Sequence, residues 1–132
     1  MMKLAIHALL VLLPVVTYAT EWRCRNNDMQ ITCTSEKCST SDSFTPMDVN
    51  FNDRGSMSIC AYSGCWEGKG KVLKSEDHIL LSGHKLIWSG ATHGSGDFMI
   101  ALDKDNRIAV INGGGFAMPL ICNSESTAKR PK

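Results

Sequence analysis

Apolar and polar residues alternate with a period of two over several stretches of this chain. The alternation is found in residues 47–52 and 98–103 and, after a turn, continues at Ile108 and Val110. Because successive side chains of a β-strand point to opposite faces, this spacing gathers apolar side chains on one face and polar ones on the other. We therefore predict strands in these stretches, with Ile108 and Val110 on the apolar face.

Turn-forming residues separate the alternating stretches. The sequences Asn52-Asp53-Arg54-Gly55 and Asp103-Lys104-Asp105-Asn106 favour tight turns, because Asn and Asp bond to nearby backbone and Gly accepts a positive φ. Shorter apolar runs follow at 72–73, 79–81, 86–88 and 116–122, and no segment after the first 19 residues has a helical period. Short strands at regular spacing predict an all-β fold, either a small antiparallel β-sandwich or a barrel. The polar segment 34–46 is predicted to be a loop with at most one short turn.

The first 19 residues have the pattern of a secretory signal peptide. Lys3 gives a positive start, 4–16 is an apolar run, and Thr17-Tyr18-Ala19 gives a small-x-small cleavage pattern. The run is shorter than the ~18–20 residues that span a bilayer, so a membrane anchor is the less favoured interpretation. We predict removal of 1–19, a single β domain over 20–122, a disordered tail over 123–132, and no membrane insertion after cleavage.

The charge balance argues against a nucleic-acid partner. Lys3 is the one basic residue of 14 that leaves with the signal, so basic and acidic residues balance at 13 each. Binding to phosphate requires clustered Lys or Arg, and the only short basic run, 129–132, closes the predicted tail. We expect no nucleic-acid partner, while recruitment through this tail is a lesser alternative.

All six cysteines follow the predicted signal. An even number of cysteines in a short exported chain predicts disulfides formed in an oxidising compartment, periplasmic or extracellular. Six cysteines allow many pairings; we favour two short bridges of equal spacing and one clasp between the ends of the domain: Cys33–Cys38, Cys60–Cys65 and Cys24–Cys122. Zinc ligation is the alternative, but zinc-binding pairs usually have shorter spacing, and export disfavours free thiolates.

Candidate catalytic chemistry is limited to three histidines. His78, His84 and His93 lie near carboxylates in the sequence and could act as base and acid in a secreted hydrolase, or bind a metal. They also lie in or beside polar turns, where an exposed histidine is ordinary. No Gly-x-Ser-x-Gly motif, phosphate-binding loop or His-Glu-x-x-His motif is present. We therefore assign no catalytic, metal or cofactor residues.

Two aromatic residues bracket the predicted Cys60–Cys65 bridge. Tyr62 and Trp66 on a short bridged loop would lose little conformational entropy on binding, which suits an interface anchor. Trp66 could instead pack on the bridge or close the core. The nearby segment Ser89–Gly96 is polar and glycine-rich, as functional loops on rigid sheets often are. Tyr62, Trp66 and His93 are the predicted partner-binding residues.

The chain resembles two groups of proteins. Its motifs, of which the Cys60–Gly68 segment is the most specific, resemble small exported proteins of Gram-negative bacteria without an assigned function: Glu21-Trp22-Arg23-Cys24, Cys60-Ala61-Tyr62-Ser63-Gly64-Cys65-Trp66-Glu67-Gly68 and Trp88-Ser89-Gly90. The resemblance implies a periplasmic setting. The sequence Ser89-Gly90-Ala91-Thr92-His93 is similar to the Ser-Gly-x-x-Tyr loop of periplasmic lysozyme inhibitors, with His93 in place of Tyr and their second motif missing.

These features favour a binding protein. We expect a periplasmic or secreted, non-catalytic binding or inhibitory module that acts on a protein partner, such as a cell-wall hydrolase or a toxin. The first alternative is a small secreted hydrolase that uses His78, His84 or His93. The second is a passive component of the cell envelope.

Overall fold

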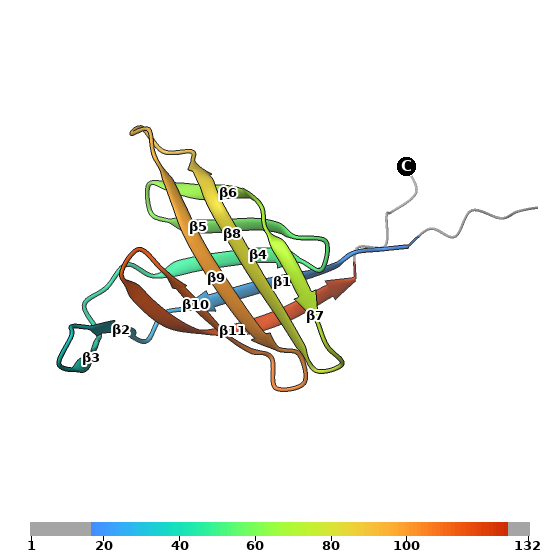
Figure 1. The fold of residues 1–132 in the computed structure, drawn as a ribbon, viewed down its shortest axis with the longest axis horizontal. Coiled ribbons are helices and arrows are strands. Elements are labelled where there is room, and N and C mark those ends of the chain that lie inside the picture. Colours follow the sequence, from blue (N-terminus) through green and yellow to red (C-terminus); the bar gives the residue numbers. More distant parts are fainter. Residues whose placement is uncertain (1–16, 127–132) are drawn as a thin grey trace, which may run out of the picture.

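The computed structural model describes residues 17–126 and consists of antiparallel strands joined by turns. Eight of the strands form a closed barrel in the order β1-β4-β5-β6-β8-β9-β10-β11, and pairing of β1 with β11 completes the ring. Strand β7 pairs with β8, and the β2–β3 hairpin extends from β11 and projects to one side (Figure 1). The predicted all-β antiparallel fold is confirmed, and it is a barrel rather than a sandwich.

The strands are short except for three long ones, β8, β9 and β11. Their bounds are β1 (Thr20–Asn26), β2 (Gln30–Cys33), β3 (Cys38–Ser41), β4 (Met47–Asn52), β5 (Ser56–Ala61), β6 (Gly64–Lys69), β7 (Lys71–Lys74), β8 (His78–Trp88), β9 (Ser95–Asp103), β10 (Ile108–Gly113) and β11 (Phe116–Ser126).

The barrel interior is filled by apolar side chains. Alternate residues of the barrel strands point inward, as the period of two requires, except at a bulge of β8 between Gly83 and Leu86. The largest fully buried side chains are Phe51, Met57, Ile59, Leu81, Leu86, Ile100, Leu102, Ile111, Met118 and Leu120. Cys24 and Cys122 are directly opposite on β1 and β11 and form a buried disulfide between residues 98 apart in sequence. This bridge fastens the seam at which the barrel closes.

Both predicted turns form, each organised by one side chain. The Asn52 Oδ1 atom accepts hydrogen bonds from the backbone N–H groups of Arg54 and Ser56, both at 3.0 Å, and Gly55 takes a φ of 95°. The Asp103 Oδ1 atom accepts from the N–H groups of Asp105 at 3.1 Å and Asn106 at 3.0 Å. These local bonds fix the β4–β5 and β9–β10 connections.

The side chains of β10 point in the opposite directions from those predicted. Ile108 and Val110 point outward and are 53% and 46% exposed, whereas Ala109 and Ile111 are buried. All four residues are apolar, so alternation alone cannot choose the inward pair. The register decides instead, because Ala109 and Ile111 are paired with the buried residues of β9.

Two segments predicted to be irregular contain strands. Residues 38–41 form β3 inside the predicted loop 34–46, and the Cys33–Cys38 bridge joins directly opposite residues of the β2–β3 hairpin. Strand β11 continues through Ser126, so its end takes in the first four residues of the predicted tail. In both cases pairing with a neighbour orders polar residues whose sequence carries no apolar alternation.

The predicted signal peptide lies mostly outside the described residues, as does 127–132 of the predicted tail. Within 17–126 there is no helix long and apolar enough to cross a membrane.

Candidate functional site

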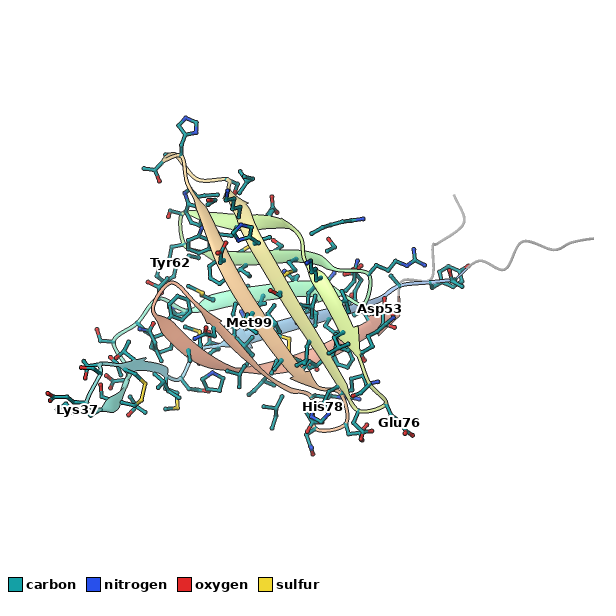
Figure 2. All side chains as sticks on the ribbon, in the orientation of Figure 1. Lys37, Asp53, Tyr62, Glu76, His78 and Met99 are labelled. Carbon is teal, nitrogen blue, oxygen red and sulfur yellow. A yellow bond between two sulfur atoms is a disulfide. The ribbon has the colours of Figure 1, made fainter. Side chains whose placement is uncertain are left out.

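One end of the barrel is built by the β5–β6 turn and the β8–β9 loop. Cys60 and Cys65 are directly opposite across β5 and β6 and form a disulfide that closes the turn. Tyr62 stands at the tip of this turn with 82% of its surface exposed. An exposed aromatic side chain on a covalently closed turn is therefore presented to solvent at this end of the molecule (Figure 2).

The bridged turn and the β8–β9 loop are held together by two hydrogen bonds. Ser89 donates its backbone N–H to the Cys65 carbonyl at 2.8 Å, and Cys65 donates its N–H to the Ser89 Oγ atom at 2.9 Å. A Cβ atom on Gly64 would lie 2.7 Å from the Gly90 nitrogen, so only glycine allows this close approach. The two segments therefore form one connected surface.

Three aromatic rings pack beneath this surface. The Trp66 ring centroid lies 4.3 Å from that of Trp88 and 5.1 Å from that of Phe98, both in tilted arrangements. Such separations are typical of favourable aromatic contacts. Trp66 is directly opposite the fully buried Ile59 on the neighbouring strand. Directly opposite residues share one face of a sheet, so the Trp66 side chain lies on the inner face at the barrel end and not on the outer wall.

A hollow of about 520 Å³ lies between the turn and the loop. Its lining is Thr45, Ala61, Tyr62, Ser63, Trp66, Trp88, Thr92, His93, Gly94 and Ser95. The lining thus combines aromatic faces with hydroxyl groups and one imidazole, and it contains no carboxylate, lysine or arginine. All three predicted partner-binding residues, Tyr62, Trp66 and His93, line this hollow.

A second hollow, of about 600 Å³, lies on another side of Trp66. At its edge the His84 Nδ1 atom is 2.9 Å from the Asp97 Oδ1 atom, and Asp97 also accepts the Lys85 backbone N–H at 2.7 Å. Lys85 has a φ of 51° and lies in a bulge of β8 between Gly83 and Leu86. The Lys85 N–H first and the His84 side chain second lower the pKa of Asp97 below its ordinary value of 3.8.

Removing His84 is expected to raise the pKa of Asp97 only in part. In His84→Ala the backbone hydrogen bond from Lys85 persists, so the Asp97 pKa should remain below 3.8, measured by NMR titration of the carboxyl carbon. Asp103, whose pKa is lowered by bonds from Asn106, should titrate unchanged as an internal control. A full return of Asp97 to its ordinary value would contradict the order of these two causes.

The lowered pKa also fixes the sign of the pH dependence. Folding favours the ionised form of Asp97, so its stabilising contribution is complete above 3.8 and is lost as the pH falls through the lower folded-state pKa. Both partners are largely exposed, with side-chain exposures of 71% for His84 and 65% for Asp97, so solvent screens the pair.

The three histidines do not converge. His78 opens β8 opposite Asp103, at the end of the β8–β9 pair away from the loop that carries His93, and Figure 2 places His78 and Tyr62 at separate ends of the barrel. His84 and His93 line two different hollows. Among residues 17–126, no group of three or more His, Cys, Asp or Glu side chains could hold a metal ion.

A larger hollow, of about 950 Å³, lies on the outer wall along β1, β4 and β11. Two ion pairs lie along it: Arg23 is 3.2 Å from Glu125, and Arg25 is 3.4 Å from Asp48; Glu21 and Asp28 also line it. We place the candidate site at the barrel end instead, because all three predicted partner-binding residues line one hollow there.

Sequence reasoning missed part of the site. Trp88 was assigned to a strand, and Thr45 to a loop, without any link to the bridged turn. Trp88 could have been linked to the site from its position directly before Ser89. Because the β8–β9 loop contacts the bridged turn through Ser89, the residue before it also lies near the turn. Nothing in the sequence marks Thr45, which comes from the connection before β4.

Comparisons of this chain with protein families, with curated proteins and with solved structures gave no significant match.

Proposed function

We propose that this protein is an exported, non-catalytic binding or inhibitory module that grips a protein partner with the barrel end around Tyr62. The partner would be a cell-wall hydrolase, a toxin or a protein of similar role. Three disulfides and a small all-β domain support a periplasmic or secreted setting, where thiols are oxidised.

The observation that carries the proposal is the exposure of Tyr62 on a bridged turn. Tyrosine is enriched among residues that dominate binding energy, and a side chain on a preorganised segment loses less entropy when it is buried by a partner. The Cys60–Cys65 bridge closes the turn and Ser89 ties it to the neighbouring loop. The adjoining hollow offers aromatic surface and uncharged hydrogen-bonding groups around this anchor.

The test compares two truncations on one hairpin. The protein is used to capture partners from periplasmic and culture extracts, and the affinity of the identified partner is then measured by calorimetry. Tyr62→Ala should weaken binding by at least about 30-fold, as expected of a central aromatic anchor. Lys69→Ala, which removes an exposed long side chain from β6 outside the hollow, is the matched control and should change affinity little. Undiminished binding by Tyr62→Ala would refute the proposed surface.

A purified lysozyme is the first partner to assay directly. Thr92 and His93, which end the sequence similar to the inhibitor loop, both line the hollow. Inhibition of lysozyme that is lost in Tyr62→Ala and in His93→Ala would identify the partner class. If the protein does not inhibit lysozyme, lysozyme is removed from the candidates, and the capture experiment remains a valid test of the proposed surface.

The alternative, a secreted hydrolase, has one favourable observation. His84 and Asp97 form a hydrogen-bonded pair beside a hollow, as a base and its orienting carboxylate do. Turnover of a substrate that is abolished by His84→Ala and retained by His93→Ala would favour this alternative over the binding module.

A further inference from the structure

Two regions of the barrel wall present different chemistry to solvent. Outward side chains of β1, β4 and β5 are mostly charged or polar: Arg23, Arg25, Asp48, Asn50, Ser56 and Ser58. Outward positions from β7 to β11 include a group of neighbouring apolar side chains, which we call the apolar wall: Leu73, Leu80, Met99, Ala101, Ile108, Val110, Pro119 and Ile121.

The apolar wall is continuous because its residues are cross-strand partners. Leu73 pairs with Leu80, Leu80 with Ala101, Ala101 with Val110, and Val110 with Pro119, in one row across five strands. Directly opposite pairs have side chains in contact distance on the same face of a sheet. Ile108 and Ile121 form a further pair beside this row, and Figure 2 labels Met99 on the same wall.

The wall is larger than isolated surface residues would account for. Its five large aliphatic residues and its methionine are between 43% and 68% exposed. At about 200 Å² for a fully exposed residue of this size, they leave roughly 650 Å² of contiguous apolar surface, above the ~300–600 Å² of the largest patch on a typical monomer. Outward leucine, isoleucine and valine on adjacent strands therefore indicate a covered face.

We propose that the apolar wall binds a second copy of this chain in a two-fold dimer. Two such walls in contact would bury about 1,300 Å², within the ~1,200–2,000 Å² of stable, specific interfaces. The centre of the wall carries no charge, which is typical of interface cores. Its border carries both signs, with Asp103 beside Ile108 and Arg25 beside Ile121, so a self-complementary contact avoids a rim of like charge.

The dimer leaves the proposed binding surface free. Tyr62 and the hollow beside it belong to the barrel end, and none of the residues that line this hollow belongs to the apolar wall. A dimer would carry two such ends, and a partner with two matching sites would gain avidity. Dimerisation does not depend on the proposed function, and either can fail alone.

Sedimentation velocity and light scattering of the full mature chain over a micromolar concentration series test the dimer. The wild-type protein should have a mass close to that of two chains and dissociate on dilution. Leu80→Lys and Val110→Lys each place a charge in the central row and should weaken association by at least about 30-fold. Asn50→Lys and Ser58→Lys, on the polar region of the barrel wall, are matched controls and should remain dimeric. All four positions point away from the core, and near-UV circular dichroism checks that each variant is folded.

Each outcome decides the proposal. A dimeric wild type and dimeric controls with monomeric Leu80→Lys and Val110→Lys would support it. A monomeric wild type, or wall variants that dimerise as well as the controls, would overturn it. Co-sedimentation of a monomeric wild type with phosphatidylcholine vesicles, lost in Val110→Lys, would also overturn it and assign the wall to a lipid surface.

Discussion

Replacing Cys24 and Cys122 together by alanine is expected to lower the free energy of unfolding by about 4–5 kcal/mol. The bridge joins residues 98 apart, so its loss releases a large loop in the unfolded chain. It also lies buried at the pairing of β1 with β11 that closes the barrel. Urea unfolding at neutral pH measures the change, and the melting temperature should fall by about 20 °C.

The matched control is the double replacement of Cys33 and Cys38. These residues are only 5 apart and close a hairpin that projects from the barrel, so the loss should be about 2 kcal/mol or less. If removing the Cys33–Cys38 bridge lowered the free energy of unfolding more than removing the Cys24–Cys122 bridge, the pairing of β1 with β11 would be stable without its covalent link.

Strand content was readable from the sequence because local patterns determine it. The residues 47–52 alternate strictly between apolar and polar side chains, and Asn52 to Gly55 carries the side chain and the glycine that its turn needs. Strand patterns did not show closure into a barrel, since it depends on β1 pairing with β11 as well as with β4. The predicted Cys24–Cys122 bridge was the one sign that the two ends of the domain meet. A period of two indicates a strand but not its neighbours.

The site was only partly predictable for the same reason. Cysteine spacing suggested the bridged turn, and the structure has the Cys60–Cys65 bridge among the three that the sequence favoured. The contact of Ser89 with Cys65 joins residues 24 apart, and no local pattern marks it. The outward facing of Val110 depended on register in the same way, so the apolar wall could not be foreseen.

Trp66→Ala is expected to lower the free energy of unfolding by about 3 kcal/mol, whereas Tyr62→Ala should change it by less than about 0.5 kcal/mol. The sequence treated both aromatics as possible anchors, but the structure gives them different surroundings. Trp66 packs against Trp88 and Phe98, and its removal would leave a cavity at the barrel end. Tyr62 is mostly exposed, so its removal costs little in the free protein. Thermal and urea unfolding of the two variants measure the difference.

The Trp66→Phe variant tests whether the stability lost in Trp66→Ala comes from the missing ring volume or from any substitution at this position. Phenylalanine keeps an aromatic ring against Trp88 and should restore more than half of the stability lost in the alanine variant. If Tyr62→Ala were as destabilising as Trp66→Ala, the tyrosine would be part of the barrel's packing, and its role as a preorganised anchor would have to be given up. If only Trp66→Ala destabilises, loss of partner binding in Tyr62→Ala reports recognition rather than unfolding.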